Sequence, residues 1–368
     1  MASKEDKSLI EVLTQHQAYL YRVSSQSVKE LLKIFNDESI LMLAKLRDLL
    51  DELNDSEKMA LASGQYTTSN LKEVRDLIAQ WFTAINTALP EAFAVSATAL
   101  AVYEANYMAK LYGGKIKKPN GEKVYAAAKK IPLVGGALVD DLLSRIAENA
   151  RQKVEYAIRD GINSGKTNQE IVQRIRGTKR LNYEDGLLSS SKTDIERTVR
   201  TVRSHVANQA YLSSFNQIGF EYVKLVATLD GRTSKLCASL DGLVWEINDP
   251  AKRVPPLHPN CRSILVPVEK DGRLVGERPF VMDERRVKDI PKEERSQLIG
   301  QLDANTTFKG FFKKTDDFFQ REWLGPKRYK LYKEGKFDFD KFFDPEGRLY
   351  TLDQLRKLDE QTFKELGL

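Results

Sequence analysis

The sequence predicts an α+β protein that is predominantly helical. Three features indicate this: a long N-terminal stretch with apolar residues at helical spacing, a central stretch with helix signals and two short β-branched segments, and an aromatic-rich C-terminal stretch. We expect a helical hairpin or arm over 1–112 and a basic linker over 113–140. We expect a compact α+β core with a short sheet and a pinned Cys/His loop over 141–283, then an aromatic-rich docking region over 284–368.

The N-terminal region has the composition of long helices. Between Ser8 and Tyr112 it has a single glycine, Gly64, and a single proline, Pro90. Apolar residues recur every three or four positions, at Ile10, Leu13, Leu20, Val23, Val28, Leu32, Phe35, Leu43, Leu46, Leu50, Leu71, Val74, Leu77, Ile78, Trp81 and Ile85. A polar break over 54–69 lets the chain reverse, so we expect an antiparallel hairpin. Such stripes usually pack within the molecule; an arm that docks on a partner is the alternative.

Residues 113–138 combine Gly-Gly and Pro-Asn-Gly turns with many lysines, which predicts irregular chain between two helical blocks. The basic cluster comprises Lys115, Lys117, Lys118, Lys123, Lys129 and Lys130. A solvated loop is the ordinary interpretation. Contact with DNA or with an acidic partner is the alternative, and Lys117 and Lys118 are its candidates.

Helices return over 140–219, where Thr167 with Glu170 and Thr193 with Glu196 match the capping-box pattern. On a helix from 194 to 216, an apolar stripe is formed by Ile195, Val199, Val202 and Val206. Three arginines lie off that stripe, namely Arg197, Arg200 and Arg203. Their guanidinium groups could grip DNA phosphates or a partner, and an ion-paired or solvated helix face is the alternative.

Both cysteines lie between two predicted strands, Val223–Leu229 and Ile264–Val268. Pro255-Pro256 stiffens the approach to His258, which stands three residues before Cys261. If the loop folds back, these two residues could meet Cys237.

Three interpretations of these side chains stay open. Cys237, His258 and Cys261 could bind zinc, and a closed four-ligand site would then need His205, Asp230 or Asp241. Cys237 and Cys261 could form a disulfide. The favoured interpretation is two reduced cysteines and a hydrogen-bonded histidine in a small core, without a cofactor.

The same stretch resembles the core signature of the phage head morphogenesis family, the Mu protein F-like minor head proteins. The positions that carry the resemblance are Thr228, Leu229, Asp230, Arg232, Cys237, Asp241, Gly242, Pro255, Pro256, Leu257, His258, Pro259, Asn260, Cys261 and Arg262. An arginine-threonine and asparagine-alanine helix upstream extends it over about 161–268. Ser234 and Ser263 stand where family members often have further cysteines.

The resemblance implies a structural minor head protein that binds the portal protein and assists head assembly, DNA packaging or genome delivery. Major capsid or scaffolding protein and non-specific DNA are further implied partners. The protein would be in the host cytoplasm during assembly and then in the virion. The signature residues would define the fold rather than catalyse a reaction.

Composition and motifs set the remaining expectations. A net charge of +6 over 368 residues is a mild bias toward anionic partners, and 30% charged residues suit a soluble protein. Pro90, Glu91 and Glu104 interrupt the most apolar segment, 84–108, so we expect neither a membrane span nor a signal peptide at the polar N-terminus. No P-loop, dinucleotide turn or nucleophile elbow occurs, so we do not expect an enzyme.

The enzymatic alternative is a metal-dependent nuclease that uses His258, Asn260 and Asp230 on the phage genome.

The C-terminal region places thirteen aromatic residues between Phe308 and Tyr350, with lysines, arginines and acids interleaved. Because the acids cancel most of the basic charge, we expect a small aromatic core or a protein-docking surface rather than a single-stranded nucleic-acid site. Thr351 with Gln354 predicts the cap of a last helix.

Overall fold

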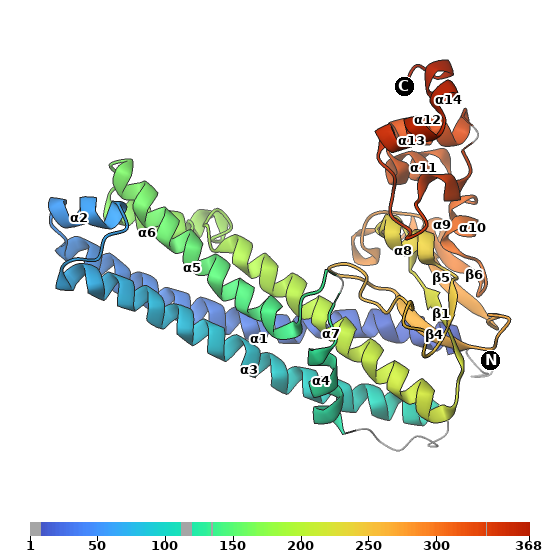
Figure 1. Cartoon of the computed structure of the whole chain (residues 1–368), viewed down its shortest axis with the longest axis horizontal. Helices are drawn as coiled ribbons and strands as arrows, with labels where there is room; N and C mark the ends of the chain where they lie inside the picture. The colour runs from blue at the N-terminus through green and yellow to red at the C-terminus, as the bar shows by residue number, and fades with distance from the viewer. Residues whose placement is uncertain (1–8, 112–119, 134, 336) are drawn as a thin grey trace. The chain divides into compact units, whose positions relative to one another are not determined.

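The computed structural model describes residues 9–111, 120–133, 135–335 and 337–368 (Figure 1). Their contacts divide the chain into two compact units. Unit 1 comprises the described residues of 9–20, 211–257 and 261–368, and unit 2 comprises the described residues of 21–210 with the three loop residues 258–260. The predicted α+β class with predominant helix is confirmed.

The elements of unit 2, within its described residues, are all helices. Its elements are α1 (Leu9–Glu52), α2 (Asp55–Ala62), α3 (Ser69–Leu111), α4 (Gly121–Lys130), α5 (Val139–Asn163), α6 (Asn168–Arg176), η1 (Lys179–Leu181) and α7 (Ser189–Ile218); the first turns of α1 and the last turns of α7 belong to unit 1. The predicted hairpin is present, since α1 and α3 run side by side (Figure 1) and the rings of Phe35 and Trp81 lie 6.4 Å apart between them. α5 packs on α2, α3, α4 and α6. Gly161 permits the close approach of α6, because a Cβ there would lie 2.5 Å from Ile171.

α3 continues through Pro90 rather than ending there. By length and composition, Ser69–Met108 could cross a membrane, and core helices of soluble proteins pass the same test. Its buried residues follow helical spacing, at Leu71, Val74, Ile78, Trp81, Ile85, Leu89 and Phe93.

Unit 1 contains two three-stranded sheets. In the first, β1 (Tyr222–Val226) lies between β3 (Val244–Glu246) and β4 (Ile264–Val268), antiparallel to both, with Lys224 opposite Val266. In the second, β5 (Glu277–Val281) pairs parallel with β2 (Leu229–Asp230) and antiparallel with β6 (Ile299–Asp303). Short helices connect and cover these strands: α8 (Lys235–Leu240), η2 (Val287–Asp289), α9 (Arg295–Leu298), α10 (Phe308–Phe312), α11 (Asp317–Leu324), α12 (Pro326–Lys333), η3 (Phe339–Phe342), α13 (Leu352–Leu358) and α14 (Glu360–Glu365).

The C-terminal aromatic residues form a buried core, as one of the two predicted alternatives stated. Phe308, Phe312, Trp323 and Phe339 pack against one another, with ring centroids 4.9 Å apart for Phe308 and Trp323. The indole N–H of Trp323 donates to the Thr233 carbonyl at 3.1 Å, which satisfies the polar group of a buried ring.

The starts of three helices and the limits of a strand were predicted from local sequence. The capping boxes at Thr167 and Thr351 are confirmed, although α14 follows the helix that Thr351 caps. The capping box at Thr193 is wrong, because α7 begins one turn earlier and Leu188 O accepts from the amides of residues 191 and 192. The predicted strand Val223–Leu229 divides into β1 and β2.

The predicted linker is not wholly irregular. Residues 121–130 form α4, because the Asn120 side chain accepts from two N-terminal amides while Lys129 and Lys130 suit the last turn. The boundary between the two compact units falls within α7. Because α7 contributes to both units, residues 141–210 belong to unit 2, whereas residues 211–257 and 261–283 belong to unit 1.

Candidate functional site

Asp230, at the end of β2, is the centre of a buried ion pair in unit 1. The Arg262 guanidinium donates to both carboxylate oxygens, at 2.8 and 2.5 Å, and the Arg232 amide and the Thr233 hydroxyl also donate to it. Burial by itself raises the pKa of Asp230, but the Arg262 hydrogen bonds and charge outweigh this effect, so the pKa is lowered. The signature residues Asp230, Arg232 and Arg262 therefore act together, as structural partners. Thr228 joins the same turn, because its carbonyl accepts from Thr233 at 2.6 Å.

A second buried carboxylate, Asp241, connects four segments of unit 1. Its Oδ1 accepts from the Ala227 amide at 2.8 Å, and its Oδ2 accepts from the Phe308 amide at 2.6 Å and from Arg278 at 3.1 Å. The side chains of Asp241 and Arg278 are 0% and 3% exposed. Gly242 follows with a φ of 93°, a conformation that favours glycine.

Arg278 was not predicted as a site residue. It lies on β5, outside the signature, and no short motif marks it. The one sequence signal for a buried arginine here is its position before the apolar residues of a strand, and this signal is weak.

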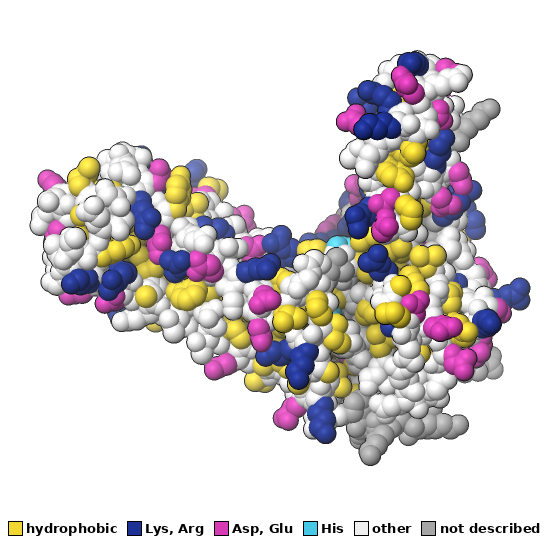
Figure 2. Space-filling view, viewed as in Figure 1, with side chains coloured by type: hydrophobic (Ala, Val, Ile, Leu, Met, Phe, Trp, Pro, Cys, Tyr) yellow, Lys and Arg dark blue, Asp and Glu magenta, His cyan; other side chains and the backbone are white. Residues whose placement is uncertain are grey.

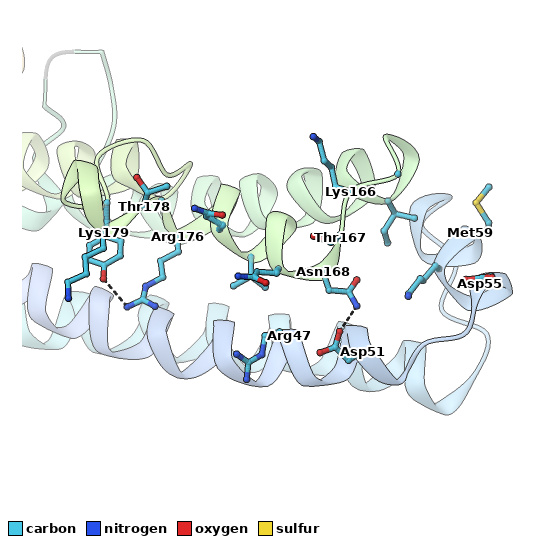
Figure 3. Close-up of a pocket in the computed structure, with 18 residues that line it drawn as sticks. Arg47, Asp51, Asp55, Met59, Lys166, Thr167, Asn168, Arg176, Thr178 and Lys179 are labelled. Atoms are coloured by element: carbon cyan, nitrogen blue, oxygen red, sulfur yellow. Dashed lines mark hydrogen bonds between the residues drawn. The ribbon is translucent and has the colours of Figure 1, made fainter.

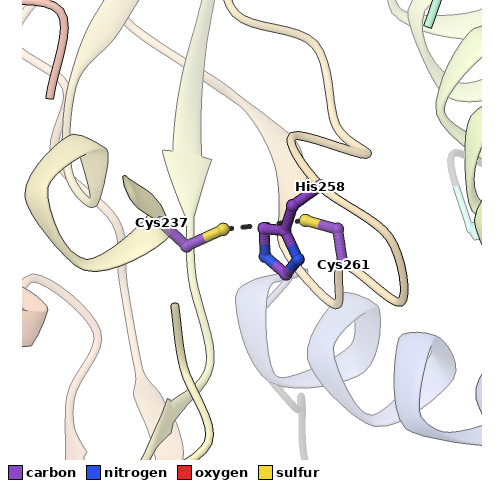
Figure 4. Close-up of side chains that lie close together, drawn as sticks. All are labelled: Cys237, His258 and Cys261. Carbon is purple, nitrogen blue, oxygen red and sulfur yellow. Dashed lines mark hydrogen bonds between the residues drawn. The ribbon is translucent and has the colours of Figure 1, made fainter. Parts of the chain in front are cut away.

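Cys237 on α8 and Cys261 before β4 bring their buried thiols together, with 3.7 Å between the sulfurs (Figure 4). The two sulfurs are not joined in a disulfide, which was one of the three open interpretations. Hydrogen bonding with Cys261 and then burial raise the pKa of Cys237. The His258 ring lies close to the two sulfurs, and the potential ligand atoms of the three residues all lie within 4.8 Å of one another.

The predicted fourth ligands have other partners. The two aspartates, Asp230 and Asp241, bind the arginines described above. A ring nitrogen of His205 on α7 lies 2.9 Å from the Ala128 carbonyl within unit 2, and burial lowers its pKa. Within the described residues, the metal-ligand cluster therefore holds three groups, Cys237, His258 and Cys261.

The loop around His258 is positioned by the backbone conformation of Asn260 and by a hydrogen bond to Thr201. Asn260 has a φ of 59°, which asparagine tolerates better than most residues, and its amide donates to the Thr201 hydroxyl at 3.0 Å. Pro256 and Pro259 flank this turn. Of the trio in the nuclease hypothesis, Asp230 is held by Arg262, so its carboxylate faces a guanidinium where a nuclease would need a metal.

The arginines of α7 are largely ion-paired. Arg197 pairs with Asp194 at 2.5 Å, and Arg200 pairs with Glu196. Arg203 is buried and donates to the Ser27 hydroxyl at 3.0 Å, which argues against a DNA contact by this residue. The other two candidates for such a contact, Lys117 and Lys118, lie outside the described residues.

Unit 2 has a groove of about 1150 Å³ that the sequence analysis did not identify (Figure 3). Its lining includes five cationic and two acidic side chains: Arg47, Lys58, Lys166, Arg176, Lys179, Asp51 and Asp55. Asn168 of α6 donates to Asp51 of α1 at 2.7 Å across it. These residues are far apart in sequence, so no local motif marks the groove. Elsewhere, on the face shown in Figure 2, basic and acidic side chains are intermixed.

Comparison with known proteins places the signature in a wider segment. No curated protein and no solved structure matches the chain. Residues 152–266, from within α5 to within β4, match the family model described as Phage Mu protein F like protein. This segment contains Asp230, Asp241 and the Cys237, His258 and Cys261 cluster. By this match, residues 152–266 are similar to the phage Mu F-like family, in agreement with the resemblance that the signature residues carry.

Proposed function

We propose that the chain is a minor head protein of a tailed phage that binds the portal protein and assists head assembly, DNA packaging or genome delivery. The observation that carries the proposal is the family match over 152–266. The geometry of that segment supports a structural role, because its two buried aspartates are engaged by Arg262 and Arg278 rather than directed into a pocket. The protein would join the head in the host cytoplasm and remain in the virion, in the head interior or at the portal vertex.

Co-expression with the portal protein of the same phage tests this role. We expect the two chains to co-elute in size-exclusion chromatography, and we expect mass spectrometry to find the chain in purified procapsids. The portal protein of an unrelated phage is the control. Procapsids that assemble normally without the chain, together with separate elution from the cognate portal protein, would refute the proposal.

We further propose that unit 2 contacts packaged DNA through the basic groove lined by α1, α6 and η1. Five cations against two acids give the lining an excess of three positive charges, and phosphate neutralisation by lysine and arginine is independent of DNA sequence. Binding should therefore weaken steeply with salt. The double variant Lys166→Glu and Lys179→Glu should lose most of the binding, whereas the same reversal at Lys313 and Lys314, outside the groove, should retain it. Equal loss in both variants would refute the assignment to the groove.

The nuclease alternative predicts divalent-metal-dependent cleavage of DNA that His258→Ala abolishes. We expect no cleavage with Mg²⁺, Mn²⁺ or Zn²⁺. Cleavage by the wild type that is absent from His258→Ala would favour the nuclease over the structural role.

A further inference from the structure

The cluster of Cys237, His258 and Cys261 has the ligand chemistry of a zinc site. Two sulfurs and one imidazole are typical zinc donors, and the thiols come from segments 24 residues apart in sequence, α8 and the loop before β4. The loop ends at Cys261, three residues beyond His258, so chain connectivity keeps the imidazole near this thiol.

The distance between the sulfurs fits a bound ion better than a covalent bond. Tetrahedral zinc with Zn–S bonds of about 2.3 Å places two sulfurs about 3.8 Å apart. The observed separation is 3.7 Å, whereas a disulfide requires about 2.0 Å. All three ligand atoms lie within 4.8 Å of one another. A nitrogen and a sulfur that bind the same zinc ion lie about 3.6 Å apart, so a movement of the His258 ligand nitrogen by about 1 Å toward the sulfurs would complete the site.

The hydrogen bond of His258 sets the tautomer that zinc needs. Its Nδ1 lies 2.8 Å from the Pro259 carbonyl oxygen. A carbonyl only accepts, so Nδ1 carries the proton in this pair; in the neutral ring this leaves the lone pair on Nε2. Zinc-binding histidines commonly donate their second ring nitrogen to a carbonyl or carboxylate in this way.

Charge balance explains how a divalent ion suits this buried position. Cys237 and Cys261 are each 2% exposed. Two thiolates, a neutral imidazole and Zn²⁺ sum to zero, so the complex avoids the large cost of a net charge removed from water. The buried carboxylates of unit 1, Asp230 and Asp241, are each paired with an arginine, so they add no uncompensated charge.

From this geometry we propose that Cys237, His258 and Cys261 bind one zinc ion, with water in the fourth position. On binding, both thiols release their protons to solvent, and zinc stays Zn²⁺ throughout. The ion fastens α8 to the loop that leads into β4 and stabilises the signature segment. This inference concerns metal binding alone and does not depend on the portal role.

The test uses the full-length chain, purified with a thiol reductant and without chelators. We expect elemental analysis to find about one zinc per chain after dialysis, and we expect cobalt exchange to give the absorption spectrum of a tetrahedral thiolate complex. Cys237→Ser, Cys261→Ser and His258→Gln should each weaken zinc retention at least tenfold. Ser239→Ala is the matched control, because this serine also lies on α8 but its hydroxyl donates to the Leu236 and Gly347 carbonyls; this variant should retain zinc.

A measurement on the wild type keeps the test decisive if variants do not fold. A strong chelator should lower the midpoint of thermal unfolding of the wild type, and zinc added in excess should restore it. Wild-type protein that carries no zinc, gives no cobalt spectrum and shows no chelator effect overturns the proposal. A disulfide between Cys237 and Cys261 in protein isolated from the cytosol overturns it as well.

Discussion

The buried pair of Asp241 and Arg278 provides the sharpest test of how unit 1 is held together. Asp241→Asn keeps the shape of the side chain but removes its charge. Arg278 then remains as a buried cation, with the carbonyls of Ala227 and Thr306 as its acceptors. The new amide also places an N–H₂ group against one of the two backbone amides, of Ala227 and Phe308, that now donate to the carboxylate.

The structure gives the expected magnitude. Breaking a buried ion pair from one side costs about 3–5 kcal/mol, because the remaining charge has lost its counter-ion without regaining water. Asp271→Asn is the matched control, since it removes the same charge from a pair whose side chains are 85% and 59% exposed. Exposed pairs contribute about 0–1 kcal/mol. We therefore expect the two substitutions to differ by about 3 kcal/mol in the free energy of unfolding.

Urea unfolding followed by tryptophan fluorescence measures this difference, because Trp245 and Trp323 both lie in unit 1. The denaturant dependence should stay the same in both variants, so that midpoints report stability alone. If Asp241→Asn and Asp271→Asn unfold within about 1 kcal/mol of each other, the reasoning about the buried pair is wrong.

Three other outcomes follow from the structure. The pKa of Asp230 is lowered in the folded chain, so its contribution to stability is present above the unfolded pKa of about 3.9 and is lost as pH falls through the folded value. The difference in unfolding midpoint between wild type and Asp230→Asn should therefore shrink below about pH 4. A constant difference from pH 3 to 7 would contradict this. Phe312→Ala should cost about 3–5 kcal/mol in urea unfolding, whereas Phe318→Ala, at a side chain 73% exposed, should cost under about 0.5 kcal/mol. Gly177→Ala should destabilise the chain more than Gly165→Ala, as measured by circular dichroism on heating. Both glycines have positive φ, but a Cβ at 177 would lie 2.7 Å from the Gly186 amide nitrogen, whereas a Cβ at 165 would have no atom within 4 Å.

Much of the local structure was predictable because it depends on near neighbours in sequence. Helical spacing gave the hairpin of α1 and α3, and hydroxyl and carboxamide side chains three residues apart gave the cap at Thr351. The predicted strand Ile264–Val268 matches β4 in both of its limits. The misplaced cap at Thr193 shows where this reasoning fails, because a helix can begin earlier when preceding serines also take helical conformation.

The candidate site was predictable only in part. Cys237, His258 and Cys261 were identified from spacing and from the stiff Pro255-Pro256 segment, and the fold does bring them together. The partners proposed for them, His205, Asp230 and Asp241, were chosen by residue type alone, and each is bound elsewhere. Residue type shows which side chains can act as ligands, but it does not show which ones already have a partner.

The sequence alone therefore determined the helical class, most element positions, the family resemblance and the three side chains of the candidate zinc site. Tertiary structure decided that Asp230 pairs with Arg262 and Asp241 with Arg278, that Arg203 is buried, and that a basic groove forms between α1 and α6. The reason is physical. Helix period, capping and turn chemistry act over a few residues, whereas an ion pair or a groove joins positions far apart in the chain, whose proximity is set by packing of the whole unit.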